Sequence, residues 1–229
     1  SGYSWRRRRS PGGLWFVLFM AALAWWQLCE ALVLLVVPLG LKILFAQLMF
    51  FGVATVAPLF FLFCFDYREL QIHLSAAARA VLWIVPVITT ALAFTNSSHH
   101  LIWSAFMPVA GTSLSIYEFP PGPALWFLVG YSYTLLLGAT VLLSGLLVKT
   151  QKQVKSQAIW IILGILAPWA GNLIYLLGLG PAAVDPTPVG FIFSGILFSR
   201  SLFRHRLLNI TPVAYGSVFD YMTDAVIVF

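Results

Sequence analysis

Charged residues are scarce in this chain, and acidic residues are the scarcest. Only 9% of the 229 residues are charged, with seven Asp or Glu against 13 Lys or Arg. Hydrophobic residues make up 61% of the sequence, and the mean hydropathy is +0.93. This composition excludes a soluble globular domain of the same length. We therefore expect one integral membrane domain.

The sequence also lacks the motifs that carry catalysis. It contains no HExxH, no pair of aspartates within apolar segments and no Gly-rich phosphate loop. The Gly-Tyr-Ser-Tyr sequence at 130–133 begins like a nucleophile elbow but lacks its second glycine and a nearby histidine. Cys29 and Cys64 are expected at different depths of the membrane, which argues against a disulfide. We expect no catalytic residue, cofactor or metal site here.

Six long apolar segments are present instead, each of about 17 to 26 residues. A helix of this length crosses a hydrocarbon core of ~30 Å at ~1.5 Å per residue. The sequence therefore predicts an all-α integral membrane fold, a six-helix transmembrane bundle. The expected spans are about 14–37, 41–65, 79–95, 123–148, 156–180 and 187–203.

The basic residues predict the orientation of this bundle. When Arg6 to Arg9 are placed in the cytoplasm, 12 of the 13 Lys and Arg fall on that side, and Lys42 alone falls on the other. This asymmetry follows the positive-inside rule and makes both ends of the chain cytoplasmic. Because these residues flank apolar spans, the pI of about 9.6 indicates contact with anionic lipids rather than nucleic acid.

The longest outer connection, 96–122, contains two segments rich in β-branched and aromatic residues. Segments 101–108 and 113–119 are separated by Ala-Gly-Thr at 110–112. Such a pair around a glycine predicts a hairpin lying over the outer mouth of the bundle. An interfacial helix is the alternative.

Polar side chains within the spans gather toward the outer side, and the inner halves are almost wholly apolar. This distribution predicts a pocket that opens outward and is closed below. The candidate ligand-binding residues are Trp26, Gln27, Glu30, Gln47, His99, His100, Trp103, Tyr131, Asn172 and Tyr175.

Glu30 is the one carboxylate deep inside a span, where a charge costs a few kcal/mol. It shares a helix face with Trp26 and Gln27. One interpretation makes Glu30 a ligand acceptor or protonatable switch. The other makes it a neutral group bonded to Asn172 or Gln47 to hold helices together.

Three further features allow both a functional and a structural interpretation. Trp169, Asn172 and Tyr175 form a stripe after Pro168, which is either a ligand wall or interhelical packing. His99 and His100 are either an external sensor of pH or anions, or caps of the third helix and the hairpin. The small residues at 190, 194, 195 and 199 offer surfaces for helix contact within the bundle or between protomers.

The last part of the chain differs in kind from the transmembrane domain, 1–206. Polar residues return in 207–224, with apolar residues at helical spacing, which predicts a cytoplasmic linker helix. Segment 225–229 is typical of a β-strand, and a single strand is unstable alone. We therefore expect the natural chain to continue into a cytoplasmic domain.

Several short motifs, taken in order, resemble the N-terminal seven-helix sensor region of bacterial histidine kinases and related diguanylate cyclases. The tail resembles the family's connector into a PAS domain. The segments that carry the resemblance are Pro11-Gly12, Trp25-Trp26 with Glu30, 95–103, Gly122-Pro123 with Trp126, 131–133, Thr187-Pro188, 204–208, 210–214 and 222–228.

This resemblance implies the input domain of a signalling protein in the bacterial inner membrane, with kinase or cyclase catalysis downstream. It also implies one helix before the six found here. We expect an extracytoplasmic or membrane-borne ligand, and relay through the last span to the output domain, in a homodimer. The expected relay residues are Arg200, Arg204 and Arg206.

Two other functions compete with this interpretation. A small transporter or channel would need polar residues continuing through the inner half, or repeated halves with broken helices. A structural anchor would only set the geometry of a dimer.

Overall fold

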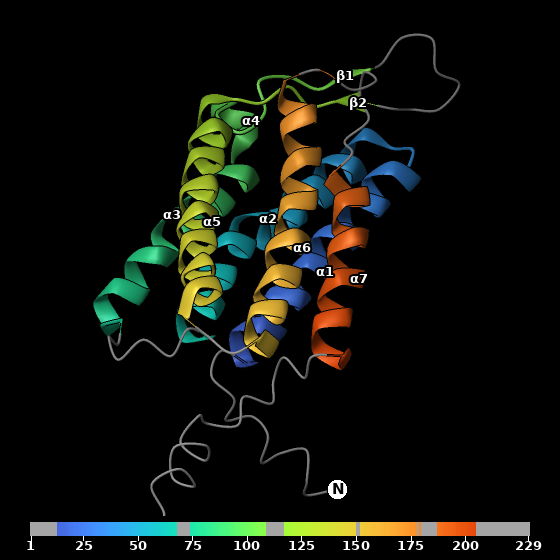
Figure 1. Cartoon of the computed structure of the whole chain (residues 1–229). Coiled ribbons are helices and arrows are strands. Elements are labelled where there is room, and N and C mark those ends of the chain that lie inside the picture. The colour runs from blue at the N-terminus through green and yellow to red at the C-terminus, as the bar shows by residue number, and fades with distance from the viewer. Residues whose placement is uncertain are drawn as a thin grey trace, which may run out of the picture.

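The computed structural model describes residues 13–67, 74–108, 117–149, 152–177, 179 and 187–204. Six long helices lie side by side as a bundle, and a short helix and two strands lie at one end (Figure 1). The predicted linker 207–224, the predicted strand 225–229 and Arg206 lie outside the described residues. The elements are α1 (Gly13–Leu35), α2 (Leu39–Tyr67), α3 (Ala76–Phe94), α4 (Asn96–His99), β1 (Met107–Pro108), β2 (Tyr117–Glu118), α5 (Pro123–Lys149), α6 (Lys152–Leu176) and α7 (Thr187–Arg204).

The two ends of the bundle differ in character. We call the end with the strands the hairpin end. The opposite end, where α3 begins and α5 and α7 end, is called the basic end. It carries Arg79, Lys149, Lys152, Arg200 and Arg204 near helix termini.

The long helices confirm the predicted membrane bundle. Five contain segments long and apolar enough to cross a membrane: Gly13–Leu35, Leu39–Tyr67, Ala76–Phe94, Pro123–Gly145 and Ala158–Tyr175. The sixth predicted span is α7, of which the segment Val189–Phe198 is apolar. Gly190 and Ser194 of this segment pack against α6.

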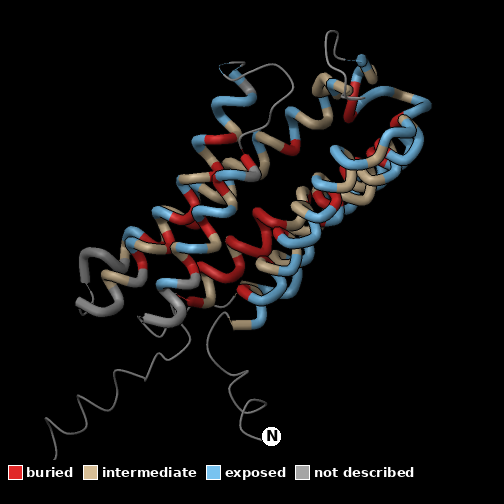
Figure 2. Tube along the Cα trace, turned by 90° about the vertical axis from the view of Figure 1, so that its right-hand side faces the viewer, coloured by how far each residue is buried: buried red, intermediate tan, exposed pale blue. Residues whose placement is uncertain are grey.

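The α2 helix is the central element of the bundle. It packs along α1 and also contacts α3 and α5, so most of its residues from Gly52 to Tyr67 are buried, whereas outward-facing residues of its neighbours are exposed (Figure 2). Gly52 permits the close approach of α1. A Cβ there would lie 2.7 Å from the Ala22 carbonyl oxygen and 3.0 Å from the backbone nitrogen of Trp26. Small residues allow such backbone proximity in membrane helices.

We expect Gly52→Ala to destabilise the bundle by about 1–3 kcal/mol, because the added methyl must push the α1 backbone away. Gly130→Ala is the matched control, since a Cβ at Gly130 meets nothing within 4 Å. The control should be neutral or stabilising by up to ~1 kcal/mol from helix propensity. Thermal unfolding of the two variants in nanodiscs measures the difference, and equal unfolding midpoints would contradict the close-approach argument.

Aromatic rings fill the bundle toward the basic end. Phe16 and Phe19 of α1, Phe60 and Phe63 of α2, and Phe198 of α7 are all buried, and we call them the phenylalanine cluster. The Phe19 and Phe60 ring centroids lie 5.1 Å apart, and those of Phe16 and Phe63 lie 5.2 Å apart. Phe198 meets Phe16 at 6.2 Å and Phe19 at 5.9 Å, so the cluster joins α7 to α1.

The predicted hairpin is present at the other end. β1 and β2 are antiparallel, with Met107 opposite Glu118 and Pro108 opposite Tyr117. An isolated bridge between Trp103 and Pro121 extends the pairing toward the bundle. The predicted turn at 110–112 lies outside the described residues.

Asn96 holds the start of the hairpin to the bundle. This side chain is 1% exposed. Its Oδ1 accepts hydrogen bonds from the backbone nitrogens of Ile102 (2.9 Å) and Trp103 (3.1 Å). Its Nδ2 donates to the Trp103 carbonyl oxygen at 3.0 Å. One amide therefore satisfies three backbone groups that are buried away from water.

Asn96→Ala should loosen the hairpin, because each buried backbone group left without a partner costs about 1–3 kcal/mol. We expect faster hydrogen exchange at the amides of Ile102 and Trp103 and a lower unfolding temperature. Ser98→Ala is the control, since its exposed hydroxyl makes only a local bond to the Thr95 carbonyl oxygen. Unchanged exchange at 102 and 103 would contradict this role for Asn96.

Candidate functional site

A cavity of about 480 Å³ lies inside the bundle. Its wall comes from α1, α2, α5, α6 and α7, and residues of the hairpin cover one end. Small-molecule sites commonly occupy about 300–1,000 Å³. The cavity is therefore large enough for a ligand of moderate size.

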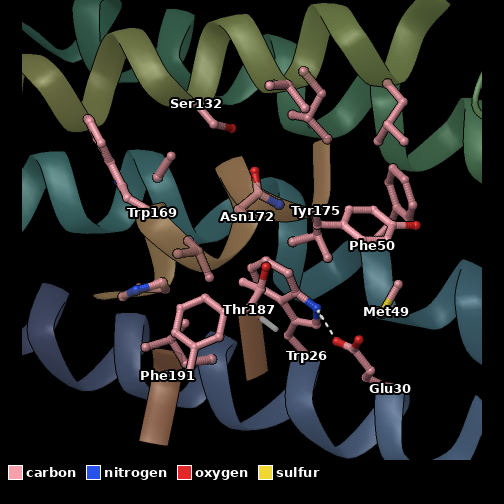
Figure 3. A pocket seen from close by; sticks show the side chains of 18 of the residues that line it. Trp26, Glu30, Met49, Phe50, Ser132, Trp169, Asn172, Tyr175, Thr187 and Phe191 are labelled. Atoms are coloured by element: carbon pink, nitrogen blue, oxygen red, sulfur yellow. Dashed lines mark hydrogen bonds between the residues drawn. The ribbon is translucent and has the colours of Figure 1, made fainter. Parts of the chain in front are cut away.

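Polar side chains from α1, α5, α6 and α7 line the hairpin end of this cavity (Figure 3). On α1, the Trp26 indole nitrogen donates to Oε2 of Glu30 at 3.0 Å. On α5 and α6, the Tyr133 hydroxyl donates to Oδ1 of Asn172 at 3.0 Å. Thr187, at the start of α7, completes this polar end.

The opposite end of the cavity is apolar. Phe19, Phe60 and Phe198 of the phenylalanine cluster line it, together with Leu23 and Ile165. All five side chains are at most 6% exposed. The cluster therefore forms a floor between the cavity and the basic end.

The cavity opens near the hairpin end. Leu34 of α1 and Tyr175 of α6 both line it, and they are 68% and 36% exposed. α1 and α7 approach each other less closely than α1 and α2 or α6 and α7 do. Aromatic rings bridge the space between α1 and α7, and the ring centroids of Trp26 and Phe191 lie 4.9 Å apart.

Five of the ten predicted ligand-binding residues line the cavity. The stripe formed by Trp169, Asn172 and Tyr175 also lies on its wall. The five are Trp26, Glu30, Trp103, Asn172 and Tyr175. That any of them binds a ligand stays a prediction.

Gln47 and Tyr131 are not on the cavity wall, contrary to the expected pocket. The Gln47 amide donates to the Ala93 carbonyl oxygen at 3.2 Å, and the Tyr131 hydroxyl donates to the Leu82 carbonyl oxygen at 2.6 Å. Both acceptors lie on α3. These two residues tie α2 and α5 to α3, because their helix faces point away from the cavity.

The expected partners of Glu30, Asn172 and Gln47, also need correction, as does the expected place of Gln27 in the pocket. Trp26, one turn earlier on the same helix, donates a hydrogen bond to Glu30, whereas Gln47 donates to the Ala93 carbonyl oxygen instead. The Asn172 Oδ1 is bonded to Tyr133 instead. Gln27 does not line the cavity, and its buried Nε2 has no hydrogen-bond partner among the described residues.

The histidine pair lies outside the cavity wall. Nδ1 of His99 accepts from the Leu101 backbone nitrogen at 3.0 Å, so in the neutral ring Nε2 carries the proton and donates to Oγ1 of Thr95 at 3.0 Å. His100 ends α4 with a φ of 55°. This geometry matches the capping interpretation of His99. No group of three His, Cys, Asp or Glu in the described part of the chain could hold a metal.

Several wall residues were not predicted from the sequence. Apolar rings such as Phe191 and Phe198 on α7 give no signal that separates a cavity face from a lipid face. Glu118 lies in the hairpin, and an acidic residue in an outer loop does not by itself indicate a binding site. The other wall residues with polar atoms that are not among the ten candidates are Tyr117, Ser132, Tyr133, Thr187 and Ser194.

Comparison with known families matches the N-terminal 7TM region of histidine kinase over residues 1–212. No curated protein and no solved structure gave a match. The match covers most of the chain, including every described helix. It agrees with the apolar helical bundle, the scarcity of charge and the motifs at 95–103 and 204–208. This chain therefore belongs to the N-terminal seven-transmembrane region of histidine kinases, a membrane sensor region.

Proposed function

We propose that this sensor region is a receptor for a small ligand that enters the cavity from the hairpin end. The observation that carries this proposal is the cavity itself, with a polar upper wall and a floor of phenylalanine rings. A concave site with a few convergent polar groups in an apolar wall is the usual form of a small-molecule site. The hairpin end then faces away from the cytoplasm, in agreement with the positive-inside rule.

A transporter needs a polar path from one side to the other, and the phenylalanine cluster occupies that path in the described helices. Phe19, Phe60 and Phe63 close the space between α1 and α2 with rings that are at most 4% exposed. A simple anchor, in turn, needs no cavity. Both features favour a receptor.

The α6–α7 pair is the element proposed to relay binding. The Ser194 hydroxyl donates to the Gly164 carbonyl oxygen, and a Cβ at Gly190 would lie 2.6 Å from Cα of Pro168. Toward the basic end, the Arg200 guanidinium lies 5.3 Å from the centroid of the Trp160 ring. These contacts join the two helices along their length, so they should move together.

Ligand binding would shift α6–α7 relative to α1–α2. Phe191 and Phe198 line the cavity and also contact rings of α1, so a ligand between them favours one arrangement over another. The shift reaches the end of α7, where Arg204 and then Arg206 lead toward the linker. In the complete protein, a bacterial inner-membrane homodimer, the change passes to a PAS-like domain and to kinase or cyclase catalysis.

Filling the cavity tests this proposal. Ser132→Phe places a ring in the cavity from α5. Ser144→Phe is the matched control on the same helix, because Ser144 is exposed and bonds only locally to the Val141 carbonyl oxygen. The complete protein in liposomes is assayed for autophosphorylation, with and without a total lipid and metabolite extract of its own cells.

We expect the extract to change phosphorylation in the wild type and in Ser144→Phe, and to have at most about a tenth of that effect in Ser132→Phe, because the added ring occupies the space of the ligand. A full response in Ser132→Phe would contradict a receptor role for the cavity.

A further inference from the structure

We infer that the ligand is a cationic amphiphile, with an amine or quaternary ammonium head beside Glu30 and an alkyl tail directed at the phenylalanine cluster. This inference rests on the proposed receptor function and specifies its ligand class. Three independent properties of the cavity lead to it: the sign of its charged residues, the aromatic rings near them, and the direction in which polarity falls.

The charged residues of the described wall are all acidic. Glu30 on α1 and Glu118 on β2 line the cavity, and the wall includes no Lys, Arg or His among the described residues. Lys42, the basic residue nearest in sequence to this end of α1, is not on the wall, and its Nζ donates to the Val33 carbonyl oxygen at 2.7 Å. Such a wall attracts a positive head and repels a carboxylate or phosphate.

The carboxylate of Glu30 is accompanied by aromatic rings. One of its oxygens, Oε2, accepts from an indole, that of Trp26, and this donor brings no positive charge. Tyr175 of α6 also lines the cavity, as do Trp103 and Phe119 of the hairpin end, whose ring centroids lie 5.9 Å apart. Rings around an ammonium group stabilise it through cation–π attraction, by about 0.5–2 kcal/mol for each good contact.

Polarity falls in one direction along the cavity. Glu30 and Phe19 stand eleven positions apart on α1, about 16 Å at ~1.5 Å per residue. Leu23 lies between them on the wall, and Phe60 and Phe198 close the end. An alkyl tail fits this space, and each buried methylene contributes about 0.8 kcal/mol relative to water.

The exposed side chains at the mouth suit such a ligand. Leu34, at 68% exposed, and Tyr175 place apolar and amphipathic surface where the cavity reaches the outside of the bundle. An amphiphile dissolved in the outer leaflet has its head at the level of the hairpin end and its tail below. It can therefore enter from the bilayer without turning over.

Binding of three amphiphiles with the same tail tests the inference. Decyltrimethylammonium, decanol and decanoate are titrated into the complete protein in nanodiscs, below concentrations that dissolve the bilayer, with empty nanodiscs as blank. Tryptophan fluorescence reports occupancy, since Trp26, Trp103 and Trp169 line the cavity. The wild type should bind the cation about tenfold more tightly than decanol, and decanoate more weakly than decanol.

Glu30→Gln should remove the preference for the cation, because it keeps a side-chain oxygen for the Trp26 bond but loses the charge. Asp66→Asn is the matched control. Oδ2 of Asp66 also accepts from a tryptophan, Trp15 at 2.9 Å, but Asp66 is not on the cavity wall. It should keep the full preference. Glu118→Lys, on an exposed strand residue, should weaken binding of the cation without disturbing the helices.

Equal binding of the cation and decanol, tighter binding of decanoate, or an unchanged preference in Glu30→Gln would each overturn the ligand class. The Ser132→Phe assay uses a total cell extract and does not depend on the class of the ligand. A wrong ligand class would therefore leave the result of that assay unchanged, and the two failures are distinguishable.

Discussion

The contact of Phe198 with Phe16 and Phe19 is the interaction on which the rest of the account depends. It joins α7 to α1 across the cavity, and the same rings close the cavity toward the basic end. Within a bilayer, apolar burial does not drive helices together, so ring packing of this kind supplies much of their association. Each aromatic pair contributes about 0.5–1.5 kcal/mol beyond its buried area. One set of contacts therefore determines both the shape of the cavity and the position of the last helix.

The bundle combines two tight pairs with a looser boundary between them. α1 and α2 approach closely at Gly52, and α6 and α7 approach closely at Gly164 and Gly190. Between α1 and α7, side-chain rings rather than close backbones make the contact. A bundle built in this way can change the angle between its pairs at a small energetic cost while each pair stays intact. The cavity lies at that boundary, where a ligand has most effect on the arrangement.

The sequence predicts the fold well because membrane helices are encoded by length and hydropathy. The expected spans 14–37 and 41–65 correspond to α1 and α2, and the glycine between two β-rich segments predicts the hairpin that β1 and β2 confirm. Glu30, Asn172 and Tyr175, which the sequence predicts to share one pocket, do line the same cavity.

The sequence did not reveal in which direction each polar side chain points around its helix. Gln47 and Tyr131 have suitable depth but point to α3, because the position of α3 beside α2 and α5 is set by packing. The floor was predicted only as apolar. Phe60 and Phe198 could equally face lipid in a segment that is hydrophobic on all sides, and only the packed bundle places their rings beneath the cavity.

Labelling of one cysteine in the cavity tests the central claim most directly. Ser132→Cys is made in a chain where Cys29 and Cys64 are alanine, and a membrane-impermeant cationic thiol reagent is added to vesicles of either orientation. The account predicts labelling from the hairpin side and none from the basic side, because the phenylalanine cluster closes that path. Labelling from the basic side at a similar rate would contradict a cavity that is open at one end and closed at the other.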